Sequence, residues 1–187
     1  MPGSLWNSFG YSSRSKDFFT RKPFPKFIEA PSADALITNQ PYIGLMVKQA
    51  DCQGVIIFDP IKHVVANVHC GWRGNVTNIL GKVVHRMSRY FDCRGSHLLA
   101  AIGPSLGPCC AEFTTHGKIF PNSFQRFMVR ENYFDLWAIS RRQLMDAGLS
   151  ADNIEIAGLC TRCRTDLFYS YRREKRTGRF GSVAMLR

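Results

Sequence analysis

The sequence has 187 residues, enough to bury the core of one domain, and its 45% hydrophobic and 12% aromatic residues exclude a disordered chain. No apolar run approaches the length of a membrane span, and the N-terminus lacks the apolar segment of a secretory signal. The net charge of +11 would attract anions, but no helix, finger or aromatic sheet motif of a nucleic-acid-binding protein accompanies it. We therefore expect a soluble cytoplasmic protein that binds small anions and has neither nucleic-acid nor membrane partners.

The cysteines support the same location. There are seven, an odd number, and Cys109 and Cys110 are adjacent. A complete disulfide framework is incompatible with this pattern, whereas free thiols or thiolate ligands suit a reducing compartment.

The N-terminal region differs from the rest of the chain. Residues 1–32 mix Ser, Phe, Lys and Pro without a period and predict an irregular arm, whereas residues 33–187 predict a single domain. Apolar runs and alternation predict strands at 43–47, 55–58, 63–69, 98–102, 154–157, 167–171 and 182–186.

Two segments have helical spacing. Asn75 is positioned to cap a helix that runs to Phe91, and a second helix follows Asp135 and stops at Gly148. Strands and helices are interspersed without a regular βαβ repeat. We therefore expect an α/β or α+β fold, a mixed β-sheet sandwich flanked by helices.

The chemistry with the strongest signal involves Cys52 and His69, the latter at the end of a predicted strand. Thiolate and imidazole are good zinc ligands, and a catalytic zinc takes three protein ligands with one open position. The same pair could be a nucleophile and its base, or a buried thiol and a hydrogen-bonded imidazole. Spacing along the sequence does not separate these alternatives.

The turn after His69 adds a candidate anion site. Arg73 offers two parallel donors to phosphate or carboxylate, and Gly74 and Asn75 stand where a helix start would present free N–H groups. The alternative is a tight turn with a solvated arginine. The sequence has no phosphate-binding loop of the G-x-x-x-x-G-K-S/T type and no G-x-G-x-x-G.

A second group of cysteines is less specific. Cys160 and Cys163 form a C-x-x-C, which with Cys109 and Cys110 could assemble a four-thiolate zinc site. The paired spacing of a zinc ribbon is absent, and no helix opens at the motif as in thioredoxin-like proteins. The sequence favours free thiols here over a redox or structural-metal role.

Together these residues resemble the bacterial laccase-domain proteins, long labelled polyphenol oxidases. The resemblance runs from about Ser32 to the C-terminus. It rests on Ser-Ala-Asp-Ala at 32–35, Ala-Asp-Cys at 50–52, Val-His-Cys-Gly-Trp-Arg-Gly at 68–74, Ile-Gly-Pro at 102–104, Gly-Pro-Cys-Cys at 107–110, Gly-Leu-Cys-Thr at 158–161 and Phe-Tyr-Ser-Tyr-Arg-Arg-Glu at 168–174.

The resemblance implies a mixed α/β sandwich that is also compared with cysteine hydrolases. It implies a zinc-containing purine nucleoside phosphorylase, with adenosine deamination and methylthioadenosine cleavage as related activities, and one bacterial branch is named a peptidoglycan-editing factor. The family's metal ligands are an upstream His in Gln-Val-His-Gly, the Cys of Ala-Asp-Cys and the His of His-Ala-Gly-Trp-Arg-Gly. The last two correspond to Cys52 and His69.

Two positions depart from the family pattern. No histidine precedes His63, so the upstream ligand has no counterpart, and Cys70 stands where the family usually has Ala. Adjacent strand residues face opposite sides, so Cys70 is not expected to join His69 as a ligand. We expect an N-terminally shortened member of the family.

The leading hypothesis is a zinc-dependent phosphorylase that acts on a purine nucleoside and phosphate, with Cys52, His69 and Arg73 as catalytic residues. Cys52 and His69 would hold the metal, and Arg73, Gly74 and Asn75 the phosphate. The alternatives are a catalytically silent binding protein, a cysteine-type hydrolase editing cell-wall peptides, and a copper polyphenol oxidase. Copper comes last because copper sites favour several imidazoles, which this chain does not cluster.

Overall fold

A six-stranded sheet forms the centre of the computed structural model, which describes Phe9–Tyr11 and residues 33–187. The strands are β1 (Phe9–Tyr11), β2 (Ala35–Thr38), β3 (Leu45–Gln49), β4 (Gln53–Asp59), β5 (Val64–Cys70), β6 (Leu99–Ile102), β7 (Met128–Arg130), β8 (Tyr133–Phe134), β9 (Ile154–Ile156) and β10 (Phe180–Ala184). Their order in the large sheet is β1-β2-β5-β4-β6-β9. Neighbours are antiparallel except β6 and β9, which run parallel.

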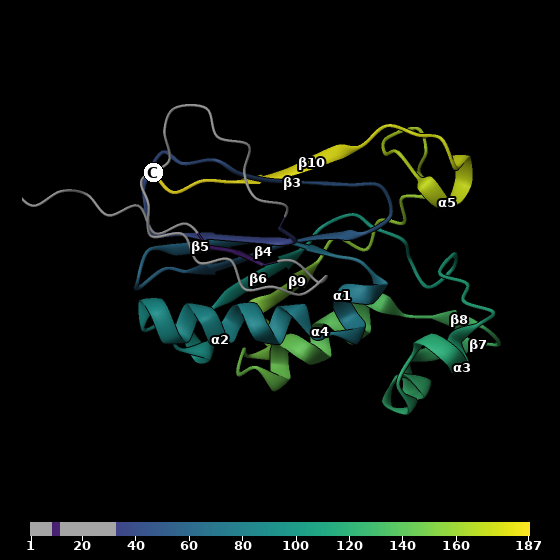
Figure 1. Ribbon diagram of the computed structural model, residues 1–187, viewed down its shortest axis with the longest axis horizontal. Helices are drawn as coiled ribbons and strands as arrows, with labels where there is room; N and C mark the ends of the chain where they lie inside the picture. Colours follow the sequence, from purple (N-terminus) through teal and green to yellow (C-terminus); the bar gives the residue numbers. More distant parts are fainter. Residues whose placement is uncertain (1–8, 12–32) are drawn as a thin grey trace, which may run out of the picture.

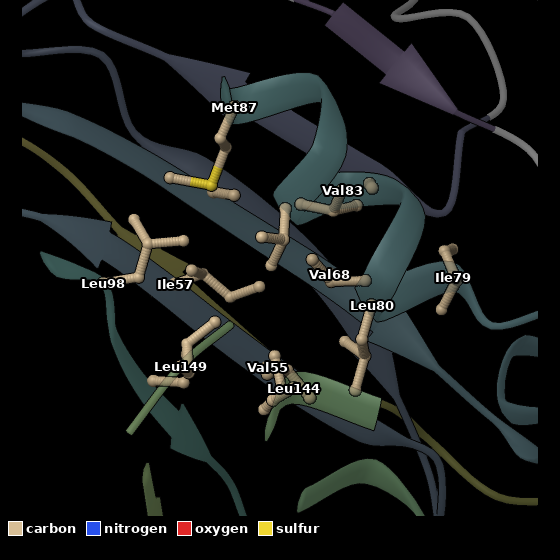
Figure 2. Close-up of a cluster of buried hydrophobic side chains, with 14 of the residues drawn as sticks. Val55, Ile57, Val68, Ile79, Leu80, Val83, Met87, Leu98, Leu144 and Leu149 are labelled. Carbon is tan, nitrogen blue, oxygen red and sulfur yellow. The ribbon is translucent and has the colours of Figure 1, made fainter. Parts of the chain in front are cut away.

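Helices cover one face of this sheet (Figure 1). The helices are α1 (Trp72–Val76), α2 (Ile79–Phe91), α3 (His116–Ile119), α4 (Leu136–Asp146) and α5 (Tyr171–Glu174), with 3-10 turns η1 (Gly95–His97), η2 (Asn122–Phe127) and η3 (Ala151–Asn153). The apolar side of α2 faces the sheet, as expected of an amphipathic surface helix. The main core fills the space between them, where Figure 2 shows Leu80, Val83 and Met87 of α2 with Val55, Ile57 and Val68 of the sheet.

The opposite face of the sheet carries a two-stranded ribbon of β3 and β10 (Figure 1). Leu45 and Ala184 of the ribbon pack on Val65 of β5 in a smaller core. Asn67 of β5 is fully buried, and its Nδ2 donates to the carbonyls of Leu45 (2.9 Å) and Ser182 (2.8 Å). The result is three layers: ribbon, sheet and helices.

A separate aromatic cluster lies between the segment that follows β6 and helix α4. Phe113, Phe120 and Phe134 pack with ring centroids 4.9 to 6.3 Å apart, and Trp72 of α1 contacts the first two at 6.3 and 6.0 Å. This cluster fixes α1 against the loops that continue from β6.

The expected mixed α/β fold is confirmed, and so are most predicted strands. Within a few residues, 43–47 corresponds to β3, 55–58 to β4, 63–69 to β5, 98–102 to β6, 154–157 to β9 and 182–186 to β10. The strand predicted at 167–171 is wrong, because these residues form turns that lead into α5. Leu167 and Tyr169 are 57% and 50% exposed, so no neighbouring strand buries their apolar side chains.

The helix predicted to start at Asn75 is two helices. Gly71 is the N-cap of α1, and the chain turns at Asn78, which adopts a left-handed conformation (φ 52°). The Asn78 side chain then caps α2 by accepting a 3.1 Å hydrogen bond from Gly81 N–H. The helix predicted after Asp135 is confirmed as α4: Asp135 caps it through Ala138 N–H, and Gly148 follows with φ 105°.

Of the region predicted as an irregular arm, the structure describes only Phe9–Tyr11, which pair with β2. The remainder of 1–32 lies outside the described residues. Among the helices of the described part, none has the length and apolar character that crossing a membrane requires.

Candidate active site

The ends of β4 and β5 bring Cys52 and His69 together. The two strands pair so that Gly54 lies opposite His69 and Gln53 opposite Cys70, which places Cys52 beside Gly71. A Cβ added at Gly71 would lie 2.7 Å from Cys52 Sγ. Glycine at position 71 therefore makes the space that the thiol occupies.

His69 is held by a carboxylate that sequence analysis did not assign a role. Its Nδ1 lies 3.1 Å from Asp34 Oδ1, and its backbone N–H donates to the Asp34 carbonyl at 2.7 Å. Hydrogen bonds to Asp34 and then to Cys52 outweigh burial and raise the pKa of His69 to about 10. The raised pKa favours the protonated form of the ring, which contacts the Asp34 carboxylate and the Cys52 sulfur.

Asp51 fixes the backbone just before Cys52. It has a positive φ of 81°, a strained conformation for a residue other than glycine. Its Oδ1 accepts the Thr161 hydroxyl at 2.7 Å, and its Oδ2 accepts the Arg172 backbone N–H at 2.6 Å. The loop before Cys52 is thus tied to two distant segments of the chain.

The three residues expected to bind phosphate have different environments. Arg73 is exposed, with its guanidinium carbon 4.3 Å from the centre of the Trp72 ring. Gly74 is buried. Asn75 is fully buried, and its Nδ2 donates to Ser140 Oγ at 2.8 Å. Of the three residues, Arg73 is the one with a side chain open to an anion.

Cys70 faces away from the thiol–imidazole pair. It is fully buried in the main core, and burial raises the pKa of its thiol to about 12. This agrees with the expectation that Cys70 does not replace a metal ligand beside His69.

The pair Cys52 and His69 supplies two zinc ligands, where a catalytic zinc normally takes three. Within residues 33–187, His, Cys, Asp and Glu donors gather in a group of three or more at only one place, and it does not include this pair. The described residues alone do not complete a catalytic zinc site at Cys52 and His69.

That one group is a cysteine cluster, formed by Cys109, Cys110, Cys160 and Cys163. Their four sulfur atoms lie within 4.8 Å of one another and could hold a metal ion. The cluster forms because β6 and β9 are parallel, so the loops that leave their carboxyl ends emerge at the same edge. Cys109 and Cys110 follow β6, and the other two follow β9.

Within the cluster, the sulfur of Cys160 receives a hydrogen bond from the backbone. The Gly107 N–H donates to its sulfur at 3.3 Å. Burial alone would raise the pKa of Cys160, but hydrogen bonds from the backbone of Gly107 and Cys163 outweigh burial and hold it below its ordinary value. The environment of this sulfur favours a thiolate.

The structure brings the predicted residues Cys52 and His69 together and adds Asp34, to which the sequence analysis assigns no role. The chain contained one signal: Asp34 precedes β2, which pairs with β5, so it lies beside the end of the strand that carries His69. For the four cysteines the sequence favours free thiols, because the paired spacing of a zinc ribbon is absent and no helix opens at the C-x-x-C.

The fold and the site define a mixed α/β sandwich protein with a Cys–His–Asp centre, and an exposed arginine follows the histidine by four residues. The chain belongs to the multi-copper polyphenol oxidoreductase laccase family, whose family model matches residues 13–187. The resemblance to laccase-domain proteins is thereby confirmed.

The chain is similar to curated proteins that are named purine nucleoside phosphorylases. The chain is 33% identical over 149 residues to a purine nucleoside phosphorylase of Bacteroides thetaiotaomicron, covering 75% of this chain and 55% of that protein. It is 30% identical over 162 residues to the purine nucleoside phosphorylase YlmD of Bacillus subtilis, covering 81% and 58%. The chain thus spans less than two thirds of the length of these curated relatives.

Solved structures agree on the fold. The hypothetical protein YfiH of Bacillus licheniformis superposes with a TM-score of 0.77 at 31% identity, covering 83% of this chain and 62% of that one. YlmD of Geobacillus stearothermophilus gives 0.75 at 28% identity, covering 84% and 62%.

Proposed function

We propose that this protein is a purine nucleoside phosphorylase whose reaction takes place at Cys52, His69 and Asp34. The observation that carries the proposal is the contact of His69 with both Asp34 and Cys52, in a chain whose relatives are named purine nucleoside phosphorylases. The substrates would be a purine nucleoside, such as inosine or adenosine, and inorganic phosphate.

Phosphorolysis needs one group that binds the phosphate anion and another that donates a proton to the departing purine. An oxygen of phosphate attacks the anomeric carbon of the sugar, the bond from that carbon to the purine nitrogen breaks, and the departing purine takes a proton. Arg73, exposed and four residues after His69, would bind phosphate through paired N–H donors. The His69 imidazolium would protonate the purine and recover its proton from the bound phosphate.

Asp34 would keep His69 protonated and oriented. A carboxylate on Nδ1 stabilises the imidazolium and leaves Nε2 as the nitrogen that faces other groups. Cys52 would also help to hold the His69 ring, since Cys52 is the second hydrogen-bond partner of His69.

Zinc is the cofactor that the family resemblance implies. Because the described residues supply two ligands at Cys52 and His69, we assign every step above to side chains and none to a metal. Zinc dependence and cleavage of methylthioadenosine are parts of the proposal that the purine-release assay measures separately. Adenosine deamination, which releases ammonia and no purine, is measured by the ammonia formed.

A cysteine-type hydrolase is the second candidate. A thiol, an imidazole and a carboxylate in series are the groups that a thiol nucleophile and its oriented base require. Such an enzyme would hydrolyse peptides, including those of the cell wall, without phosphate.

The test is phosphate-dependent release of purine from inosine, adenosine and methylthioadenosine, with and without added zinc or chelator. The variants are Cys52→Ala and, as matched control, Cys93→Ala, a buried thiol next to the end of α2. We expect release that requires phosphate, survives in Cys93→Ala and is lost in Cys52→Ala. Peptide hydrolysis abolished by Cys52 alkylation, without purine release, would favour the hydrolase, and no turnover of either kind would favour a silent binding protein.

A further inference from the structure

Four thiols from two loops meet at one point, outside the Cys52 and His69 site. We propose that Cys109, Cys110, Cys160 and Cys163 bind one structural zinc ion, which clamps the loop after β6 to the loop after β9. This site shares no donor atom with the proposed phosphorylase centre.

The sulfur separations suit a tetrahedral ion. Cys163 Sγ lies 3.5 Å from Cys110 Sγ and 3.6 Å from Cys109 Sγ, and all four sulfurs are within 4.8 Å of one another. Zinc–sulfur bonds of about 2.3 Å in tetrahedral geometry require sulfurs roughly 3.8 Å apart. A disulfide requires about 2.05 Å, so these contacts are too long for a bonded pair.

The backbone already holds both loops in place. Ser105 N–H donates to the Leu159 carbonyl and Thr161 N–H to the Ser105 carbonyl, each at 3.1 Å, which extends the parallel pairing of β6 and β9 up to Cys160. The Gly107 N–H donates to Cys160 Sγ at 3.3 Å. N–H donors of this kind stabilise a metal-bound thiolate and orient it.

Basic residues offset the charge of the site. Zinc with four thiolates carries a net charge of −2, which is costly beside buried residues unless cations are near. Arg130 Nη2 donates to the Cys109 carbonyl at 3.1 Å, and Arg162 stands between Cys160 and Cys163 in the sequence. The Arg130 guanidinium therefore lies against the cluster.

The donor set indicates both the metal and its role. Thiolates select soft or borderline ions, and four sulfurs in tetrahedral arrangement are typical of zinc. Four protein ligands leave no open position for substrate, so the ion would be structural. The ion would also help to hold the loop of Cys52 in place. Thr161, next to Cys160, donates a hydrogen bond to Asp51, next to Cys52.

The test measures zinc by elemental analysis in protein purified with a reductant and dialysed against zinc-free buffer. We expect about one tightly bound zinc per chain, as for a four-thiolate structural site. Cys163→Ser, at an exposed position, should lose it, whereas Cys93→Ser and Cys52→Ala should keep it. Cobalt in place of zinc should give intense thiolate-to-metal absorption, absent in Cys163→Ser.

Zinc that persists in Cys163→Ser, or that disappears in Cys52→Ala alone, would overturn the proposal. If Cys163→Ser fails to fold, alkylation of the unmodified protein decides: zinc should protect the peptides carrying the four cysteines and leave the Cys52 peptide reactive. Equal labelling with and without zinc, or a disulfide in the reduced protein, would also refute it. None of these readings requires enzyme activity, so the result stands whether or not the phosphorylase proposal holds.

Discussion

The Thr161 hydroxyl donates a 2.7 Å hydrogen bond to Asp51 Oδ1 and so joins the loop of the cysteine cluster to the loop of Cys52. Thr161 is fully buried, and Asp51 has the strained backbone that the bond helps to hold. One side-chain contact thus connects two sites that are far apart in sequence.

Replacing Thr161 with Val keeps the shape of the side chain and removes this bond. A hydrogen bond to a charged group contributes about 1.5 to 3 kcal/mol, so we expect a loss of that order in the free energy of unfolding, measured by urea denaturation. Thr165→Val, at an exposed position in the same region, should change it little. Equal stability of the two variants would show that the bond is not made in solution.

Asp34→Asn should lower the pKa of His69 from about 10 toward 6.5, because the variant removes the largest cause of the upward shift. The titration of the His69 ring in metal-free protein, followed by NMR, gives the value directly. Asp146→Asn, which breaks a surface pair with Arg142, should leave the His69 titration unchanged.

The same shift fixes the pH range over which the Asp34 and His69 pair stabilises the fold. Because the folded pKa lies above the unfolded value, the contribution is complete below about pH 6.5 and disappears as pH rises through about 10. The difference in unfolding free energy between the unmodified protein and Asp34→Asn should therefore be larger at pH 6.5 than at pH 10. A difference that grows with pH would contradict the assignment.

Gly71→Ala should displace the Cys52 thiol, since the new Cβ would lie 2.7 Å from its sulfur. Misplacing a reacting group by about 1 Å costs on the order of a hundredfold in rate, so we expect purine release to fall by about that factor. Gly117→Ala is the control, because no atom lies within 4 Å of the Cβ it would add. Full activity in Gly71→Ala would mean that Cys52 is not needed where the structure places it.

Asn75→Ala should destabilise the fold and leave phosphate binding alone. The Asn75 side chain joins α1 to α4 by donating to Ser140 Oγ at 2.8 Å. The other link, from Gln143 Nε2 to the backbone carbonyl of Asn75 at 2.7 Å, is kept in the variant. Losing a buried hydrogen bond costs about 1 to 3 kcal/mol. A higher KM for phosphate with unchanged urea stability would instead return Asn75 to the anion site, and Asn39→Ala at an exposed amide is the control.

The sequence was informative where apolar periodicity and burial agree. The strands β4 and β5 and the helix α4 follow directly from alternation, spacing and the Asp135 cap. The break at Asn78 was missed because the apolar period runs through it, while the left-handed turn depends on a single residue. The apolar residues at 167–171 predict a strand, but these residues form turns. A strand also needs a partner strand, and the apolar pattern alone does not show whether one is present.

The candidate site was only partly predictable for a similar reason. Cys52 and His69 belong to short motifs that can be recognised in the sequence. Asp34 contacts His69 because β2 pairs with β5, and the register of that pairing cannot be predicted from the local sequence pattern. The cysteines likewise meet only through the parallel pairing of β6 with β9.

That parallel pairing has a consequence for the order of folding. Cys109 and Cys163 are 54 residues apart, and the chain between them includes the aromatic cluster and α4. Closing so long a segment is slow, because its entropy is lost before the distant contacts form. We therefore expect the four thiols to come together late in folding, so that an ion held by them would bind the folded chain and slow its unfolding.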